Sequence, residues 1–337
     1  MTEATDRLYQ MLSGFRVTQM VRTAALLGIC DALAGGPRTA AEVATEVGAD
    51  PMLLRRLMRA LAGLGTLVEG TDRRFSNAAI GELLRKDVPG SMRNAAIGLP
   101  DDMYWDAWRQ LPQGVRGGAI PFELAHDRSM WDKVAADPAF AARFNGFMAA
   151  QTAIFVPQLL DAFDFSTCTR VVDVGGGNGA LIAGTLAAHP PVSGTLFDLD
   201  AGLEGAEAYL REHGVADRCK LEAGNFFESI PEDGDAYLLK LILHDWDDER
   251  ATAILKTCRR AMRPGEHLLV MDHILPELAV PGPREAQALT MDLHMYVLFG
   301  ARERTEKELR GMLSEAGFRV DRVVPTSPPS TIVAVAI

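Results

Sequence analysis

The chain has 337 residues, 48% of them hydrophobic and 23% charged, as expected for a globular protein of one large domain or two ordinary ones. Its net charge of −11 argues against nucleic acid or an anionic membrane as the main partner. The sequence contains no apolar run of about 20 residues and no apolar signal segment near its amino-terminal end. The four cysteines lack the spacing of a metal or redox site, so we expect a cytoplasmic protein with free thiols.

Residues 1–96 are predicted to form a mainly helical domain. Apolar residues recur at helical spacing over residues 15–37, where two glycines and a proline end the pattern. A capping box at Thr39 begins the next helix, and Pro51 suits the first position of another. Residues 65–78 then predict a short hairpin with a turn near its glycine and aspartate. Helices followed by a hairpin are typical of a winged helix.

A winged-helix pattern suggests DNA binding, but two features of this segment favour another role. Acidic residues roughly balance the basic ones, and the first helix carries more apolar surface than a small winged helix needs to fold. Since a fold alone does not determine a function, we interpret residues 1–96 as a winged-helix-like dimerisation domain.

Residues 97 to about 165 predict a helical bridge that is rich in aromatic and methionine side chains, among them Trp108, Trp131 and Phe144. Most of these side chains are expected to form a helical core. Aromatic and methionine side chains at the mouth of a cleft also make a flat apolar slot for a ring.

After Cys168 the apolar pattern changes to short runs separated by helical segments. The runs are RVVDV, TLFDL, KLEAG, AYLLKLIL and HLLVMDHI. Alternating strands and helices predict a mostly parallel sheet, and the tail 318–337 predicts an antiparallel hairpin at its edge. We therefore expect residues 97–337 to form a helical linker plus a Rossmann-like α/β domain.

The segment VVDVGGGNGALI, residues 171–182, combines a buried strand, a glycine turn and the start of a helix. Gly175, Gly177 and Ala180 satisfy the dinucleotide-binding fingerprint, which by itself is a weak signal. The glycines permit a positive φ and close approach of the backbone to a ligand, and the helix begins with free N–H groups. These features suit any cofactor that contains an adenine nucleoside.

Two carboxylates favour S-adenosylmethionine over NAD. Asp198 ends the second strand, where it can accept hydrogen bonds from both ribose hydroxyls. Asp173 precedes the glycine turn, where it would repel a pyrophosphate but attract an ammonium and a sulfonium group. A dinucleotide fold would also need a second nucleotide-binding half, whereas this chain continues into an antiparallel hairpin.

Three further residues are predicted to lie at the cofactor. Asn225 follows the third strand and can bond the adenine amino group, while Phe226 can pack on the adenine ring. Lys240 lies on the fourth strand near the crevice.

His244 is the candidate catalytic residue. It follows the fourth predicted strand directly, and ligands of open parallel sheets bind beyond the carboxyl ends of the strands. Histidine is the side chain best suited to take up a proton near neutral pH. The alternative is that His244 only caps the helix that begins near Asp247 and Asp248, whose charges favour a helix amino terminus.

Two acidic residues decide for the catalytic interpretation. Asp272 ends the neighbouring strand, and Glu303 is expected to begin the last helix. Either carboxylate could bond the second imidazole nitrogen and orient the ring. The remaining buried or surface histidines, His126, His267, His273 and His294, are interpreted as surface or structural residues. No carboxylate and histidine cluster has the spacing of metal ligands, so no metal is expected.

These residues resemble the plant-type small-molecule O-methyltransferase family, in its bacterial natural-product branch. The segments VVDVGGGNGALI, LFDL, GNFFESIPEDGDAYLLKLILHDWDDERA, VMDHILPE and GARERTEKELRGMLSEAGF stand in family order. The resemblance implies a homodimer with S-adenosylmethionine as cofactor, and His244 as the base, supported by Asp272 and Glu303. The positions that it implies for cofactor and substrate are, for the cofactor, Asp173, Gly175, Gly177, Asp198, Leu199, Asn225, Phe226 and Lys240, and for the substrate Phe144, Met148, Met295 and Phe299.

One departure concerns Asn225, because the family usually has aspartate there. An amide oxygen still accepts a hydrogen bond, so we expect weaker cofactor binding and not its loss. The implied reaction is methylation of a hydroxyl on an aromatic or polycyclic small molecule. Some relatives keep the cofactor but hydroxylate or rearrange their substrates, and the intact pattern around His244 argues against that chemistry here. A NAD oxidoreductase and a DNA-binding regulator remain as alternatives of other classes.

Overall fold

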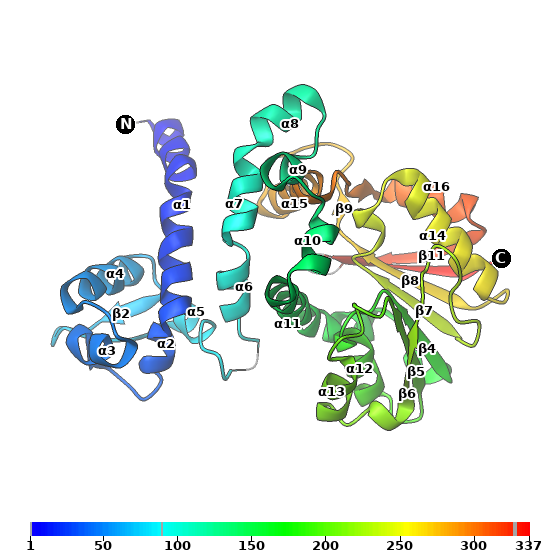
Figure 1. The fold of residues 1–337 in the computed structure, drawn as a ribbon, viewed down its shortest axis with the longest axis horizontal. Helices are drawn as coiled ribbons and strands as arrows, with labels where there is room; N and C mark the ends of the chain where they lie inside the picture. The colour runs from blue at the N-terminus through cyan, green and yellow to red at the C-terminus, as the bar shows by residue number, and fades with distance from the viewer. Residues whose placement is uncertain (1, 89, 326–328) are drawn as a thin grey trace. The chain divides into compact units, whose positions relative to one another are not determined.

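The computed structural model describes residues 2–88, 90–325 and 329–337, and it divides into two compact units (Figure 1). The first unit comprises Met1–Trp105 together with Gly146–Gln151, and the second comprises Asp106–Asn145 together with Thr152–Ile337. The predicted boundary between residues 96 and 97 lies a few residues before this division and stays a prediction.

Local capping explains where the helices of the first unit begin and end. Its elements are α1 (Glu3–Leu27), α2 (Ile29–Ala32), β1 (Arg38–Thr39), α3 (Ala40–Val47), α4 (Pro51–Gly63), β2 (Leu67–Glu69), β3 (Arg74–Asn77), α5 (Ala79–Glu82) and α6 (Arg93–Gly98). Thr39 and Glu42 form the predicted capping box of α3, and Asp50 caps α4 ahead of Pro51. The helical spacing predicted over residues 15–37 corresponds to two helices, because Gly28 adopts a left-handed φ of 70° that ends α1 before α2 begins.

The predicted winged-helix hairpin is present in the first unit. Strands β1, β3 and β2 form an antiparallel three-stranded sheet in that order. Buried side chains of α3, α4 and the sheet, such as Val43, Met58 and Phe75, pack into one apolar core. Arg55 and Arg59 of α4 face Glu69 of β2 across ion pairs, so part of the basic charge of this helix is neutralised locally.

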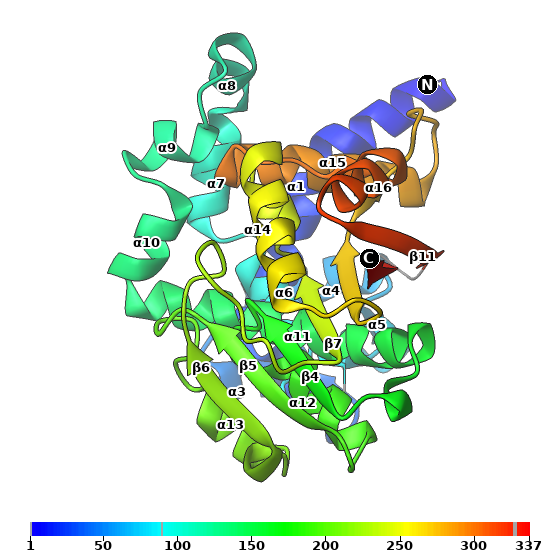
Figure 2. The ribbon, with the colours of Figure 1, turned by 90° about the vertical axis from the view of Figure 1, so that its right-hand side faces the viewer.

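The second unit is built around a seven-stranded sheet in the order β11-β12-β8-β7-β4-β5-β6 (Figures 1 and 2). The strands are β4 (Arg170–Val174), β5 (Ser193–Asp198), β6 (Cys219–Ala223), β7 (Ala236–Lys240), β8 (His267–Asp272), β11 (Phe318–Val324) and β12 (Ser330–Ala336). The first five pair in parallel, and β12 pairs antiparallel with both β8 and β11. This topology confirms the predicted parallel sheet with an antiparallel hairpin at its edge.

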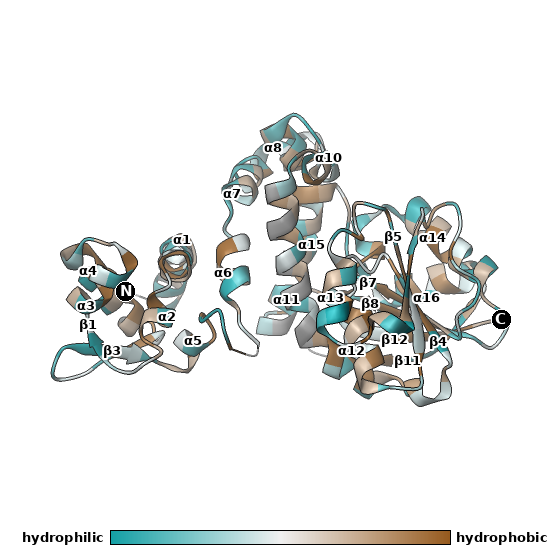
Figure 3. Ribbon diagram, turned by 60° about the horizontal axis from the view of Figure 1, so that its bottom comes forward, coloured by the Kyte–Doolittle hydropathy of each residue, from teal (hydrophilic) through white to brown (hydrophobic). Residues whose placement is uncertain are grey.

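Helices cover both faces of the sheet, so its strands are apolar on both sides. The helices of this unit are α8 (Leu111–Gly117), α9 (Pro121–His126), α10 (Met130–Ala136), α12 (Ala180–Ala188), α13 (Ala206–Glu212), α14 (Asp248–Ala261), α15 (Pro283–Phe299) and α16 (Glu306–Glu315), while α7 (Asp102–Arg109) and α11 (Pro138–Ala162) contribute to both units. One core joins the sheet to α14 and α16, and the other joins it to α12 and α13. Figure 3 colours α12 mainly as hydrophobic, in keeping with its burial.

Two predicted boundaries near the candidate site were wrong. The fourth strand ends at Lys240 and not at residue 243, because Leu241 adopts a left-handed φ of 53°. Glu303 does not begin the last helix, since Thr305 caps α16 and Glu303 precedes the short strand β10 (Arg304–Thr305). β10 pairs with β9 (Ile274–Leu275), which directly follows the end of β8. That pairing brings the segment of Glu303 beside the carboxyl end of the sheet.

Among the residues that the structure describes, no helix is both long and apolar enough to cross a bilayer.

Candidate active site

His244 lies in a buried 3₁₀ turn, η3 (Leu243–Asp245), beyond the carboxyl end of β7. The left-handed Leu241 bends the chain out of the sheet, and its N–H still donates to the carbonyl of Met271 in β8. His244 does not cap the following helix, because the side chain of Asp247 accepts the N–H of Arg250 and caps α14. The alternative interpretation of His244 as a cap is therefore wrong.

Glu303 makes the direct contact with the imidazole. Its Oε1 lies 2.8 Å from Nδ1 of His244, and both side chains are buried. The other ring nitrogen, Nε2, lies 3.5 Å from Oδ1 of Asp245. Asp272 is also buried at the end of β8, where its charge acts on the ring. Of the two acids that the sequence left open as partners of the second nitrogen, Glu303 holds that position.

Arg304 fastens the segment of Glu303 to the turn of His244. Its guanidinium donates to the carbonyls of Leu243 and Trp246, each at 2.8 Å, and to the carboxylate of Asp248. Only 2% of Arg304 is exposed, so these carbonyls would lack a partner without it. The loop that carries His244 is thus held by a buried ionic and hydrogen-bonded anchor.

Burial raises the pKa of three acids around His244, namely Asp245, Asp272 and Glu303. It raises the pKa of Asp245 and that of Asp272 to about 7 each, although the charge of His244 opposes both shifts. The pKa of Glu303 rises to about 9, first because of burial and then because of the negative charge of Asp292. Such displaced values are typical of sites that transfer protons.

Two histidines that the sequence analysis placed at the surface or in structural roles lie beside His244. His273 is buried, and its ring stacks parallel to His244 at 6.4 Å between centroids. His294 of α15 accepts a hydrogen bond from the indole N–H of Trp108 at 3.1 Å. Burial, together with the charge of His244, lowers the pKa of His273 and that of His294 to about 4. Both rings are therefore neutral at physiological pH. No sequence motif marks these two histidines as neighbours of His244, and only the tertiary structure shows that they are.

The glycine turn has the form expected of a nucleoside site. Gly175 and Gly177 have φ values of 72° and 57°, and no atom lies within 4 Å of the point where a Cβ of Gly177 would stand. Asp198 accepts the N–H of Gly177 at 2.8 Å and that of Leu199 at 2.7 Å. The carboxylate predicted to bind ribose thus shapes the turn, and each of its oxygens keeps a second lone pair.

Asp173 is buried in β4, and its Oδ2 has no hydrogen-bond partner among the described residues. Burial raises its pKa to about 7, against the attraction of Lys240 at the end of β7. Burial also lowers the pKa of Lys240 to about 8, and its ammonium lies 5.9 Å from the centroid of the Phe155 ring. An unpartnered buried carboxylate is a suitable neighbour for a cationic ligand.

Asn225 and Phe226 lie at the expected loop after β6, with local partners of their own. The amide of Asn225 accepts the N–H of Phe227 at 3.0 Å and donates to Glu228 at 3.0 Å. The Phe226 ring packs edge-on against Phe227 and Trp246. A Cβ on Gly175 would lie 3.6 Å from the Phe226 ring, so this ring borders the glycine turn.

Aromatic side chains from three helices gather near the site. Trp131 of α10 contacts Phe144 of α11 edge-on at 6.3 Å and Phe299 of α15 at 5.1 Å between ring centroids. Met295 is buried one turn before Phe299 on the same helix. Met148 lies one turn after Phe144 on α11, within the segment that belongs to the first unit. Trp131 was not among the predicted substrate residues, although the sequence analysis noted it in the aromatic-rich segment.

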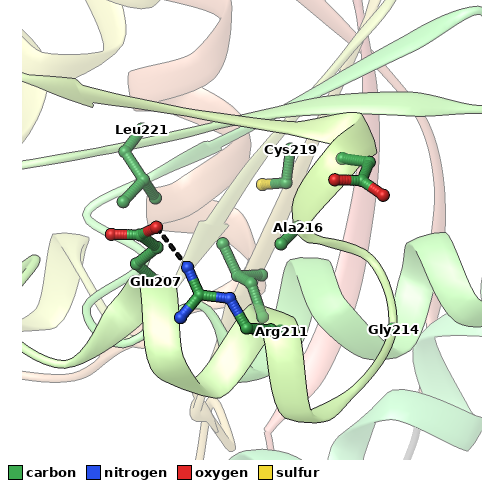
Figure 4. Close-up of a pocket in the computed structure, with 8 residues that line it drawn as sticks. Glu207, Arg211, Gly214, Ala216, Cys219 and Leu221 are labelled. Atoms are coloured by element: carbon green, nitrogen blue, oxygen red, sulfur yellow. Dashed lines mark hydrogen bonds and ion pairs between the residues drawn. The ribbon is translucent and has the colours of Figure 1, made fainter.

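A separate hollow of about 410 Å³ lies beside α13 and the start of β6 (Figure 4). It is lined by Cys219 and Leu221, and by Glu207 and Arg211, which form an ion pair at 2.5 Å. Cys219 is the first residue of β6, so this hollow lies at the amino end of that strand. It is lined by none of the predicted site residues.

Two family models match the chain. The model of the O-methyltransferase domain matches residues 108–319, and that of the O-methyltransferase dimerisation domain matches residues 9–87. The second match confirms the predicted homodimer, and together they confirm the predicted fold class.

Individual proteins match over nearly the whole chain. The phenazine O-methyltransferase PhzM of Lysobacter antibioticus is 38% identical over 326 residues, which cover 97% of this chain and 94% of that protein. The aclacinomycin 10-hydroxylase RdmB of Streptomyces purpurascens is 32% identical, with 93% and 84% covered.

Solved structures agree with this similarity. The crystal structure of LaPhzM matches with a TM-score of 0.91, 37% identity and all of both chains covered. NcsB1 from neocarzinostatin biosynthesis, in complex with S-adenosylmethionine and 2-hydroxy-5-methyl naphthoic acid, matches with a TM-score of 0.75 and 31% identity, with 95% of this chain and 96% of that chain covered.

Proposed function

Since the chain belongs to the O-methyltransferase family, we propose that it methylates a hydroxyl group of an aromatic or polycyclic small molecule, with S-adenosylmethionine as methyl donor and His244 as general base. The observation that carries this proposal is the buried contact of 2.8 Å between Nδ1 of His244 and Glu303 at the carboxyl end of the sheet. This contact gives the imidazole one orientation and leaves Nε2 as the nitrogen that can receive a proton.

The residues at the glycine turn fit S-adenosylmethionine. Gly175 and Gly177 give the nucleoside access to the backbone, and Asp198 stands where ribose hydroxyls can donate to it. The unpartnered carboxylate of Asp173 suits the positive charge of this cofactor, which a pyrophosphate would lack. Asn225 and Phe226 are assigned to the adenine, Leu199 to the ribose side, and Lys240 to the crevice. When bound, the cofactor supplies an electrophilic methyl group.

The residues around His244 are suited to accept one proton from the substrate. With Glu303 bonded to Nδ1, Nε2 is the ring nitrogen that we propose takes the proton of the acceptor hydroxyl. Asp272, buried beside the ring, stabilises the charged imidazole. His273 and His294 are neutral and add no opposing charge at physiological pH. The enclosed site excludes water, which strengthens each of these interactions.

The aromatic side chains support a planar acceptor. Phe144, Phe299 and Trp131 contact one another, and Met295 is buried next to them. Large aromatic and methionine surfaces bind rings with little loss of side-chain entropy. The names of the relatives agree, because PhzM methylates a phenazine and NcsB1 was crystallised with a naphthoic acid. The role of Met148 in substrate binding stays a prediction from the family resemblance.

Mass spectrometry can test this function directly. The full-length protein is incubated with S-adenosylmethionine and a panel of phenols, hydroxylated phenazines and hydroxynaphthoic acids. A product that gains one methyl group, and that His244→Ala forms far more slowly, supports the proposal. Methylation confined to amines, thiols or carboxylates would contradict the hydroxyl assignment.

A second candidate function is hydroxylation with retention of the cofactor, because one relative bears the name of a hydroxylase. An incubation that also supplies molecular oxygen and a reductant separates the two, since hydroxylation adds one oxygen atom from molecular oxygen to the substrate and leaves S-adenosylmethionine unconsumed. The proton-accepting pair of His244 and Glu303 favours methyl transfer.

We also propose that the enzyme works in the cytoplasm. All four cysteines are buried free thiols, which fits a reducing compartment.

A further inference from the structure

Asp292 of α15 contacts the residue that holds the base. Its Oδ1 accepts the backbone N–H of Glu303 at 2.9 Å, while the side chain of Glu303 holds Nδ1 of His244 at 2.8 Å. Asp292 was not among the predicted site residues, since it lies mid-helix and its sequence neighbours show no motif. The turn that leads from α15 to β10 brings it next to Glu303.

Asp292 is half-buried, and besides bonding the backbone of Glu303 it borders an open hollow. This hollow, of about 510 Å³, is lined by Asp247, Asp292, Tyr296 and Arg302, among others, and contains neither His244 nor Glu303. Water in the hollow can solvate a charge on Asp292, whereas Glu303 is only 1% exposed. The carboxylate of Asp292, which water can reach, therefore lies next to the buried residue Glu303.

The geometry makes the charge of Asp292 act on the shared proton. A negative charge near Glu303 disfavours its ionised form, and it is the second cause, after burial, of the raised pKa of Glu303. Because Glu303 and His244 share a proton across 2.8 Å, their titration belongs to the pair. A negative charge behind Glu303 therefore strengthens the proton affinity of the pair as a whole.

Other charges surround the pair, and the inference concerns only the change that Asp292 makes. The ionisable groups that face it are Asp245 on η3, Lys240 on β7, Asp272 and His273 at the end of β8, His294 on α15 and Arg304 on β10, with Asp248 of α14 paired to Arg304. Asp292 differs from the other acids in bonding the backbone of Glu303 itself.

We propose that Asp292 is a positioning residue that strengthens the proton affinity of the His244–Glu303 pair, by holding the backbone of Glu303 and by placing a solvated negative charge behind it. The proposal rests on the function proposed above only for its consequence in catalysis. The electrostatic effect on the pair exists whether or not methyl transfer is the reaction.

Asp292→Asn is the decisive variant, since its amide oxygen still accepts the N–H of Glu303 while the charge is gone. We expect the titration of His244, followed by NMR of ¹³C-labelled histidine rings in the full-length protein, to move about 0.5–1 unit to lower pH. The signal of His244 is identified by its loss in His244→Ala. The acidic limb of the pH–rate profile, measured with a phenol accepted in the mass-spectrometric screen, should move in the same direction.

Asp247→Asn is the matched control, because Asp247 lines the same hollow and asparagine still caps α14. It should move the titration much less than Asp292→Asn does. Asp292→Ala removes both the charge and the hydrogen bond, so it should add a loss of thermal stability to the titration shift.

An unchanged His244 titration in folded Asp292→Asn would overturn the proposal. So would equal shifts in Asp292→Asn and Asp247→Asn, which would indicate a general effect of net charge. A loss of stability in Asp292→Ala without any titration shift would reduce Asp292 to a structural residue. Failure of the proposed function is distinguishable, because it would leave the NMR shift intact while no phenol is methylated.

Discussion

Nδ1 of His244 lies 2.8 Å from Oε1 of Glu303, although the two residues are 59 positions apart in the sequence. Glu303 holds Nδ1 of the ring, while Nε2 lies 3.5 Å from Oδ1 of Asp245, so the imidazole has one orientation. Arg304, the next residue after Glu303, bonds the carbonyls on both sides of His244 and holds the two segments together.

His244→Ala should retain cofactor binding but lose roughly 10²–10⁴ in methylation rate, the range that a general base contributes. The loss follows because the variant removes the ring that Glu303 holds beyond the carboxyl end of the sheet. Methyl transfer is followed by mass spectrometry and cofactor binding by calorimetry. His213→Ala, which removes an exposed histidine stacked on Tyr209, serves as control. Turnover of His244→Ala at the wild-type rate would contradict the assignment of the base.

Asp198→Ala should weaken binding of S-adenosylmethionine by about 10–100-fold, because it removes the ribose acceptor together with the hydrogen bonds to Gly177 and Leu199. Calorimetric titration measures this change. The exposed Asp200, two residues further on, provides the matched control as Asp200→Ala. An affinity equal to that of the wild type would exclude the ribose role of Asp198.

Cofactor affinity should increase with pH through the neutral range. Burial raises the pKa of Asp173 to about 7, so its carboxyl is partly protonated at pH 6 and ionised at pH 8. A cationic ligand binds the ionised form better, and binding should therefore release a proton near pH 7. Calorimetry in buffers of different ionisation enthalpy measures this release. Asp173→Asn should bind more weakly and abolish most of the pH dependence, and the persistence of an equal dependence would point to another group.

Arg304→Met should lower the free energy of unfolding by about 3 kcal/mol, because the carbonyls of Leu243 and Trp246 lose their buried donor. Urea unfolding monitored by circular dichroism provides the measurement. Arg302→Met is the comparison, since Arg302 pairs with the same Asp248 at the surface, where ion pairs contribute about 0–1 kcal/mol. Equal decreases in the free energy of unfolding of both variants would show that buried Arg304 stabilises the protein no more than exposed Arg302 does.

Much of the catalytic unit was predictable from local sequence. The glycine turn at residues 171–182 and the alternation of apolar runs depend on backbone freedom and side-chain periodicity, which short segments carry by themselves. The capping box at Thr39 in the first unit is likewise local. The parallel sheet, its edge hairpin and the place of the crevice could thus be anticipated. The cofactor class followed from the positions of Asp173 and Asp198 relative to the turn.

The predicted boundaries were wrong where a backbone angle or a contact between distant residues determines where an element begins or ends. The pattern of AYLLKLIL does not predict the positive φ of Leu241 that ends β7 at Lys240. Non-glycine residues adopt a positive φ mainly where tertiary contacts impose it. Glu303 was placed at the start of a helix because its spacing suited one, whereas Thr305 makes the cap.

The sequence by itself determined the fold class, the nucleoside-binding turn and the histidine, because each depends on residues that are neighbours along the chain. Only the tertiary structure decided that Glu303 and not Asp272 holds the imidazole, that His273 and His294 lie beside it, and that Asp292 stands behind Glu303. The reason is that proton affinity in a protein depends on burial and on charges within a few ångströms, and those distances exist only after strands, turns and helices far apart in sequence have packed together.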